Sequence, residues 1–333
     1  MSKNHIYGLG NALVDIEIEV KDDELKRMSV DKGVMTLIDE QRHHELLGHV
    51  EGQKHNRACG GSAANTTIAV AQLGGKSFYS CSIGSDETGD FYFEDLQREG
   101  VASILDSAPR AEGVTGKCLV MITPDADRSM NTYLGIASDL TRDSIDLDVL
   151  KSSNYLYIEG YLASSQLATN TSVYAIKHAK DNSVPVAISL SDLSMINFCR
   201  HGLDAMLEGG IDLLFSNEVE ALAYTDSDDL DTACERMKSI AKEFVVTLGP
   251  KGAIVFDGKA MIEIAPNTVE TVDTNGAGDL FAGSFLYALS NGYSHAQAGA
   301  IASYASATLV TVFGPRLKPE HVEKVRKYAR SLA

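Results

Sequence analysis

The segment VDTNGAGDLFAGSFLYALSNG, residues 272–292, contains the pattern that decides the fold. Phe281, Phe285 and Leu289 recur at helical spacing, which predicts an amphipathic helix that ends at Asn291-Gly292. The helix would begin in the small residues that precede this run, where backbone N–H groups stay exposed at the positive end of the helix dipole. The segment therefore predicts an anion-binding site that needs no lysine or arginine. The residues expected to form it are Gly276, Ala277, Gly278 and Asp279.

Asp279 admits two interpretations. A carboxylate in the first turn of a helix is commonly no more than a favourable partner of the helix dipole. Beside an anion site, a carboxylate can also accept the proton of an acceptor hydroxyl while N–H groups hold the charge that develops on a phosphoryl group. The residues alone favour the first interpretation.

A second glycine-rich segment, ACGGSAANTTIAVAQLGG, spans residues 58–75. Gly61 allows a close approach of the backbone, and Ser62 is placed to cap the helix that follows. Asn65 would project from the first turn toward a ligand bound at this helix end. A plain helix start with a capping serine explains the same residues, so the local pattern leaves both interpretations open.

Two other glycine patterns fail as nucleotide-binding loops. In YGLGNAL, residues 7–13, Leu13 replaces the third glycine of the dinucleotide fingerprint, and the next residues alternate as in a strand. Gly75-Lys76-Ser77 lacks the earlier glycine that a Walker A loop requires, because Val70 stands at that position.

Composition narrows the function classes. The chain has 333 residues and a formal net charge of −17, from 29 Lys and Arg against 46 Asp and Glu. This balance argues against partners such as nucleic acids and anionic membranes, but a local pocket can still bind a small anion. The five cysteines form no CxxC pair, so neither a disulfide framework nor a zinc site is expected, and a reducing cytoplasm fits best. No signal-peptide core or membrane-length apolar run is present, so we expect no membrane partner.

The order of expected elements predicts an α/β fold. The second half alternates strands and helices, which indicates a parallel sheet with helices on its faces. The expected strands there are 154–159, 184–190, 211–216 and 244–249, and the expected helices are 164–181, 201–209, 218–225 and 229–242. The first part contains a strand region over 5–20 and strands at 33–39, 116–123 and 129–134, with no convincing helix between Arg110 and Leu134. We therefore expect antiparallel pairing in a small separate sheet.

Five motifs in sequence order resemble the PfkB carbohydrate kinase, or ribokinase-like, family. DTNGAGD (273–279) and GGSAAN (60–65) resemble its two signatures, and three shorter matches are GNALVDI (10–16), SNEVEA (216–221) and VVTLGPKG (245–252). Softer similarities to the adenosine kinase branch are Asn275 and the segments YIEGYL (157–162), ISLSDLSMINF (188–198) and DRSMNTYL (127–134). Leu280 departs from ribokinases, which often carry threonine there.

The resemblance implies a three-layer α/β/α domain with a mainly parallel central sheet and a small β-sheet lid. Residues 1–333 would form one catalytic domain, with the lid built from roughly 16–39 and 112–136. Exposed lid strands could pair between subunits, so the chain is expected to be a monomer or a homodimer through the lid.

The resemblance also implies a reaction, in which the γ-phosphoryl group of ATP moves to a primary hydroxyl. Adenosine, converted to AMP, is the favoured acceptor. Inosine, guanosine, ribose, fructose and 2-keto-3-deoxygluconate are the alternatives. A catalytically silent nucleotide-binding regulator is a third hypothesis, against which the intact Asp279 argues.

Site roles follow from the resemblance, residue by residue. Asp279 would be the general base, with the backbone of residues 276–279 as the anion hole. Asp15 would bind vicinal sugar hydroxyls through two acceptor oxygens, although its alternating strand alone suggests a solvated charge. The remaining substrate residues would be Gly60, Gly61, Asn65, Arg128 as a phosphate clamp, and Tyr161, which forms an apolar wall with Met35 and Leu37. A surface position explains Arg128 equally well, and ordinary packing explains the wall residues.

The nucleotide side is implied in the same way. Asn217, Thr247, Gly249, Gly252 and Gly278 would contact ATP. Asn217 and Glu220 would order water around Mg²⁺, and the same pair also fits a helix-capping box. A monovalent cation such as K⁺ would lie at Asp273 and at main-chain carbonyls near Asn275 and Gly314.

Overall fold

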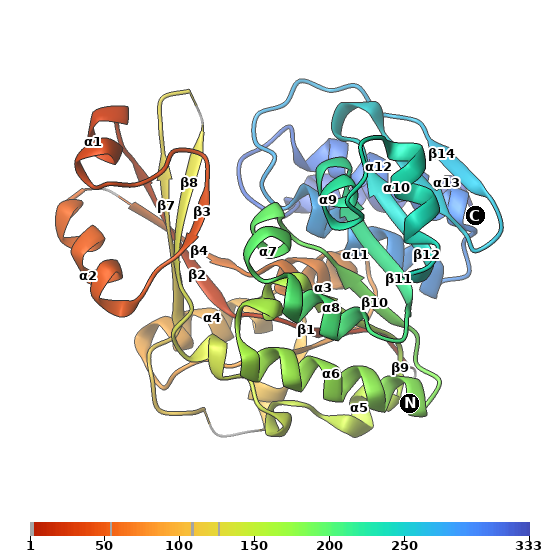
Figure 1. Cartoon of the computed structure of the whole chain (residues 1–333), viewed down its shortest axis with the longest axis horizontal. Helices are drawn as coiled ribbons and strands as arrows, with labels where there is room; N and C mark the ends of the chain where they lie inside the picture. Colours follow the sequence, from red (N-terminus) through yellow and green to blue (C-terminus); the bar gives the residue numbers. More distant parts are fainter. Residues whose placement is uncertain (1–2, 54, 108–109, 126) are drawn as a thin grey trace.

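The computed structural model describes residues 3–53, 55–107, 110–125 and 127–333, and its centre is a nine-stranded sheet (Figure 1). The strand order is β14-β13-β12-β11-β10-β9-β1-β5-β6, and all neighbours from β12 to β6 are parallel. The pairs β12–β13 and β13–β14 are antiparallel. The strands are β1 (Asn4–Leu9), β5 (Ser77–Ser80), β6 (Ala102–Ser103), β9 (Ser153–Glu159), β10 (Val186–Ser189), β11 (Ile211–Asn217), β12 (Ala241–Thr247), β13 (Ala253–Phe256) and β14 (Met261–Ile264).

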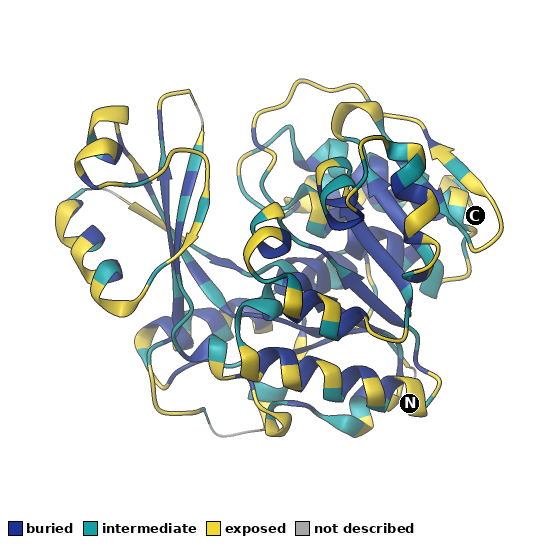
Figure 2. Cartoon of the chain, in the orientation of Figure 1, coloured by how far each residue is buried: buried dark blue, intermediate teal, exposed yellow. Residues whose placement is uncertain are grey.

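Helices cover both faces of this sheet, which confirms the three-layer prediction. Successive strand residues point to opposite layers: Leu213 packs in one hydrophobic core and Leu214 in the other. Figure 2 shows the sheet strands as the most deeply buried part of the body. One layer contains α5 (Leu147–Lys151), α6 (Gln166–Asp181), α7 (Leu193–Phe198), α8 (Arg200–Leu207), α9 (Glu218–Tyr224) and α10 (Leu230–Met237). The other contains α3 (Ser62–Gln72), α4 (Glu87–Arg98), α11 (Ala277–Ser290), α12 (His295–Leu309) and α13 (Pro319–Ser331).

A five-stranded sheet stands apart from this body, at the left of Figure 1. Its order is β3-β8-β7-β2-β4, from β2 (Leu13–Glu19), β3 (Met35–Leu37), β4 (His55–Gly60), β7 (Gly116–Ile122) and β8 (Arg128–Tyr133). The helices α1 (Asp22–Arg27) and α2 (Glu40–His49) cover its outer face, where Ile18, Leu25, Leu46 and Leu119 form a small core of their own. The inner face is thereby left toward the body.

The expected antiparallel pairing of this small sheet is wrong for two of its four strand pairs. β7–β8 and β2–β4 are antiparallel, but β2–β7 and β3–β8 are parallel. The parallel pairs join segments that are distant in sequence, so no local connection constrains their direction. The sheet also includes β4, which we did not predict.

Other boundaries differ locally from the predictions. The helix expected over 229–242 ends at Met237, and β12 already begins at Ala241. Ser62 is not a cap: Gly61 occupies the N-cap of α3 with φ of +97°. Short 3₁₀ helices lie at Ile104–Asp106, Gly135–Asp139, Arg142–Ser144, Gly160–Ser164 and Gly249–Lys251. Within the described residues, no helix has the length and apolarity needed to cross a bilayer.

The strand order places a binding crevice beside β1. The chain leaves β1 on one side toward β5 and β6, and later returns on the other side through β9 to β12. At such a switch point, the loops beyond the carboxyl ends of neighbouring strands diverge and open a crevice. The small sheet is built from segments inserted on either side of this point, after β1 and before β9.

Candidate active site

A cavity of about 390 Å³ lies where the carboxyl ends of the large-sheet strands face the small sheet. Its lining includes most of the residues expected from the sequence: Met35, Leu37, Asp15, Gly61, Asn65, Tyr161, Asn217, Glu220, Thr247, Asn275, Gly276, Ala277, Gly278 and Asp279. Six expected residues are not in the lining: Gly60, Arg128, Gly249, Gly252, Asp273 and Gly314. The structure therefore gathers residues from both sheets and from the starts of α3, α9 and α11 at one place.

The start of α11 has the open N–H groups that an anion site requires. Gly276 caps the helix with φ of +73°, a conformation that favours glycine. The Ala277 N–H donates to the Thr274 carbonyl at 3.2 Å, so it is not available as the sequence suggested. Within the described part of the chain, the N–H groups of Gly278 and Asp279 have no acceptor. Gly278 is exposed, and no atom lies within 4 Å of the position where its Cβ would be.

The Asp279 carboxylate is oriented by two side chains of α3. Ser62 Oγ donates to Oδ1 at 2.6 Å, and Asn65 Nδ2 donates to Oδ2 at 3.0 Å. Burial raises the pKa of Asp279 to about 6, while these two hydrogen bonds favour its ionised form and limit the rise. The carboxylate is thus mostly ionised at neutral pH, and its pKa is close enough to that pH for it to accept a proton.

Asp15 faces the cavity from β2 of the small sheet. Burial, with a smaller contribution from the charge of Glu17, raises the pKa of Asp15 to about 7. Gly60 acts on the site indirectly, because a Cβ at this residue would lie 2.6 Å from Asp15 Oδ2. The missing side chain of Gly60 is what leaves space for the Asp15 carboxylate.

Arg128 ties the small sheet to the loop before α11. Its Nη2 lies 2.8 Å from Asp273 Oδ2, and its Nη1 lies 3.3 Å from Glu17 Oε1. The Asp273 carboxylate also accepts the N–H groups of Gly314 at 2.9 Å and Asn275 at 3.0 Å. Because Arg128 already neutralises this carboxylate, the residues do not fit a bound monovalent cation.

Asn217 and Glu220 form the capping box of α9. Glu220 N donates to Asn217 Oδ1 at 2.8 Å, and Asn217 N donates to Glu220 Oε2 at 3.1 Å. Burial raises the pKa of Glu220 to about 7, and its hydrogen-bond donors are neutral groups of Asn217. A buried carboxylate without a cationic partner among the described residues fits a nearby hydrated Mg²⁺, which takes few protein ligands.

Three further residues shape the site in ways that the sequence pattern did not predict, although Ser62 and Glu159 lie in the segments GGSAAN and YIEGYL. Glu159, 1% exposed at the end of β9, accepts the N–H groups of Asn11 at 2.8 Å and Ala63 at 2.7 Å. Ser62 was interpreted as a cap and is instead a partner of Asp279. Arg316, in the segment after α12, donates from Nε to Asn65 Oδ1 at 3.2 Å. These contacts join residues that only the fold brings together.

Apolar side chains make up part of the cavity lining, and this part is called the apolar wall. Tyr161, Met195 and Phe215 contribute to it from the body. From the small sheet and its flanks come Leu13, Met35, Leu37, Met130 and Leu134. This surface suits a flat, poorly hydrated group better than a free sugar, whose hydroxyls need polar partners.

The chain is similar to a known family and to several known proteins. Residues 25–321 match the family model described as pfkB family carbohydrate kinase. The adenosine kinase of Dictyostelium discoideum is 28% identical over 92% of this chain and 94% of its own length. Two solved structures are each 31% identical: a probable sugar kinase protein from Rhizobium etli CFN 42 (TM-score 0.90, 100% of both chains) and the adenosine kinase of Sinorhizobium meliloti (TM-score 0.89, 98% of this chain and 99% of that one).

Proposed function

The chain belongs to the pfkB family of carbohydrate kinases, and from this premise we propose that it phosphorylates the primary hydroxyl of a nucleoside, with adenosine as the favoured acceptor. A sugar or nucleoside kinase with ATP as co-substrate and an alcohol as acceptor is the broader class to which it belongs. The observation that carries the proposal is the Asp279 carboxylate beside the open N–H groups of α11, in a cavity with an apolar wall.

On this proposal the acceptor lies between the two sheets. Asp15 accepts hydrogen bonds from two sugar hydroxyls, and Gly61 and Asn65 complete the sugar site. The apolar wall at Met35, Leu37 and Tyr161 takes the base. The small sheet then serves as the lid of a single catalytic domain, although its edge also includes β4.

The proposed chemical step needs little positive charge from side chains. Asp279 accepts the proton of the acceptor hydroxyl, and the N–H groups of Gly278 and Asp279 stabilise the charge on the transferring phosphoryl group. Gly276 and Ala277 contribute by setting the direction of the helix start. Hydrated Mg²⁺, held through Asn217 and Glu220, would supply further charge neutralisation on the phosphates.

The remaining nucleotide contacts are proposed around the end of β12. Thr247 lines the cavity, and Gly249 and Gly252 belong to the turn that follows it, where they would approach the ribose and phosphates of ATP. Arg128 would reach the phosphoryl group only by exchanging its contact with Asp273. We propose that Arg128 leaves Asp273 and contacts the phosphoryl group instead, and that it then acts as a charged clamp.

The apolar wall distinguishes this proposal from its main alternative, a kinase for a free sugar. Identity to the Rhizobium etli and Sinorhizobium meliloti proteins is equal at 31%, so similarity does not choose between them. A base buried against Met35 and Tyr161 would contribute binding energy that ribose or fructose cannot obtain.

The test is ADP release with MgATP and a panel of adenosine, inosine, guanosine, cytidine, ribose, fructose and 2-keto-3-deoxygluconate. We expect the highest kcat/KM with adenosine, and no release by the Asp279→Asn variant prepared in parallel, which controls for contaminating kinases. Activity on ribose without activity on any nucleoside would refute the proposed acceptor. If none of the compounds causes ADP release, the result would support a silent nucleotide-binding protein instead of a kinase for any of these substrates.

A further inference from the structure

A buried arginine lies behind the two residues that hold Asp279. Arg316 follows Pro315 in the segment between α12 and α13, and its side chain is only 15% exposed. Its Nη1 pairs with Asp95 of α4, its Nη2 donates to the Cys59 carbonyl at 2.7 Å, and its Nε donates to Asn65 Oδ1 at 3.2 Å. Contacts to three separate segments fix the plane of the guanidinium group.

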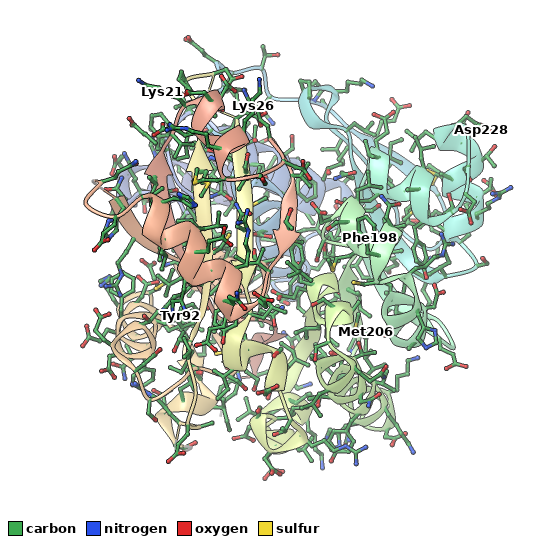
Figure 3. All side chains as sticks on the ribbon, turned by 60° about the vertical axis from the view of Figure 1, so that its left-hand side comes forward. Lys21, Lys26, Tyr92, Phe198, Met206 and Asp228 are labelled. Carbon is green, nitrogen blue, oxygen red and sulfur yellow. The ribbon has the colours of Figure 1, made fainter. Side chains whose placement is uncertain are left out.

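The residues around this arginine are buried and hydrogen-bonded. Tyr92 of α4, labelled in Figure 3, is fully buried and donates from its hydroxyl to the Gly60 carbonyl at 3.1 Å. Asp95 is 5% exposed and has a second cationic partner in Arg98. Arg316 is therefore held by buried neighbours, and it contacts the cavity lining through Asn65.

The chemistry of the arginine determines which way the Asn65 amide points. A guanidinium group has only donors, so the atom of Asn65 that faces Nε must be the oxygen. The amide nitrogen is then directed at Asp279 Oδ2, 3.0 Å away. A flipped amide would place N–H groups against the guanidinium and an oxygen against the carboxylate, which would lose both hydrogen bonds.

We propose that Arg316 is a positioning residue, which fixes the Asn65 amide so that its N–H₂ group, and never its oxygen, faces the Asp279 carboxylate. The role of Asp279 as base rests on the proposed function, but the orientation of the amide does not. Arg316 does not itself line the cavity and makes no hydrogen bond or ion pair with Asp279 among the described residues, so its effect on the base passes through Asn65.

Several groups act on Asp279 and bear on its titration. Ser62 and Asn65 donate to it from α3. The other titratable groups coupled to it are Asp15 of β2, Tyr157 and Glu159 of β9, and Tyr161 in the following 3₁₀ helix. Replacement of Arg316 by lysine leaves all of these in place and keeps the positive charge. It removes the fixed guanidinium donor to Asn65, together with part of the contacts to Asp95 and the Cys59 carbonyl.

The experiment follows the carboxyl carbon of Asp279 by ¹³C NMR through a pH titration of the free protein, with Asp279→Asn for assignment. Arg316→Lys should raise the pKa of Asp279 by about one pH unit, because the Asn65 amide then samples the wrong orientation. The matched control is Arg326→Lys, since Arg326 donates to the Gln72 carbonyl at the other end of α3. It should leave the titration unchanged.

A double-mutant cycle separates positioning from a general loss of structure. In an Asn65→Ala background, Arg316→Lys should no longer move the pKa of Asp279, although it should still lower the melting temperature as much as in the wild type. The proposal would be overturned if Arg316→Lys still shifts the pKa of Asp279 in the Asn65→Ala background, or if Arg316→Lys alone does not shift it. If Arg316→Lys does not fold, Asp95→Asn replaces it. This variant loosens the anchor of Arg316 and should shift the titration in the same direction, and an unchanged titration would equally overturn the proposal.

Kinetics distinguish this proposal from the proposed function. In an active kinase, Arg316→Lys should shift the acidic limb of the pH–kcat profile to higher pH by the same amount. At pH values on this limb, kcat should then fall roughly tenfold. A shifted NMR titration in a protein that phosphorylates no acceptor would refute the proposed function and leave the positioning role of Arg316 intact.

Discussion

Two helices begin at the cavity with a glycine at the cap, and they differ in what fills the first turn. In α3, which follows Gly61, the N–H of Ala63 donates to Glu159 at 2.7 Å. In α11, which follows Gly276, the N–H groups of Gly278 and Asp279 have no acceptor in the described part of the chain. The chain thus supplies its own carboxylate to the positive end of α3 and leaves that of α11 for an anion from outside.

The two caps share the reason for their glycine. A Cβ at Gly61 would lie 2.3 Å from the Asn11 carbonyl oxygen, and one at Gly276 would lie 2.5 Å from the Pro315 carbonyl oxygen. A backbone carbonyl group packs closely against each capping glycine, so the direction of both helix starts is fixed. What separates a structural helix start from a proposed catalytic one is therefore the occupant of the first turn, and this difference can be tested.

Asp279→Asn should have the largest effect. The amide keeps the shape of the side chain but cannot accept the proton, so we expect kcat to fall by about 10³–10⁴, with a much smaller change in the Kd of the acceptor. Steady-state kinetics together with calorimetric binding measure the two quantities. A variant that turns over at close to the normal rate would exclude Asp279 as the base.

Gly276→Ala should come next, with Gly278→Ala as its control on the same helix start. The first change forces a Cβ into a left-handed conformation and against Pro315, which should cost about 2–3 kcal/mol of unfolding free energy. The second meets no atom and should leave stability within about 0.5 kcal/mol while lowering kcat. Chemical denaturation compares them, and equal losses would mean that the cap is not strained.

Glu159→Gln tests the internal anion of α3. Its amide nitrogen cannot accept, so one of the N–H groups of Asn11 and Ala63 loses its partner. At pH 7 we expect the unfolding free energy to fall by about 2 kcal/mol. Glu87→Gln, an exposed change in the first turn of α4, is the control and should alter stability by less than about 0.5 kcal/mol. A stable Glu159→Gln protein would show that α3 does not need this carboxylate.

The pH dependence of stability should give the smallest effect. The pKa of Asp279 is raised to about 6 from 3.8, so the folded state binds more protons than the unfolded state between these values. Asp279 therefore contributes a loss of stability as pH rises through this window, and the Asp279→Asn variant lacks that contribution. After allowance for partial exposure to the cavity, the variant should gain about 1 kcal/mol relative to the wild type between pH 4 and pH 6. Denaturation at constant ionic strength measures it, and a constant difference across the window contradicts the raised pKa.

The comparison also explains how much the sequence could predict. The bounds of α11 were found because its apolar period and its terminal Gly292 are local signals. The parallel pairing of β2 with β7 joins residues as distant as Leu13 and Gly116, so no local pattern encodes it. Glu159 and Arg316 were missed for the same reason, since each reaches the site only through the topology of the sheet.

Arg128 shows the opposite limit. Motif similarity placed it near a phosphate, whereas the structure pairs it with Asp273 and Glu17. The motif identifies the arginine, but it does not show whether the guanidinium group contacts a phosphate or a carboxylate of the chain when no ligand is bound. The capping box of Asn217 and Glu220 was predictable, because residues three apart in a helix start contact one another directly.

The most direct test of the account is the response of individual backbone amides to a bound triphosphate. The ¹H–¹⁵N resonances of Gly278, Asp279 and Ala63 are followed while a non-hydrolysable ATP analogue and Mg²⁺ are added in the presence of adenosine. We expect downfield shifts for the amides of Gly278 and Asp279 and an unchanged resonance for Ala63, whose N–H already donates to Glu159. Unmoved Gly278 and Asp279 amides at saturating analogue would contradict this expectation.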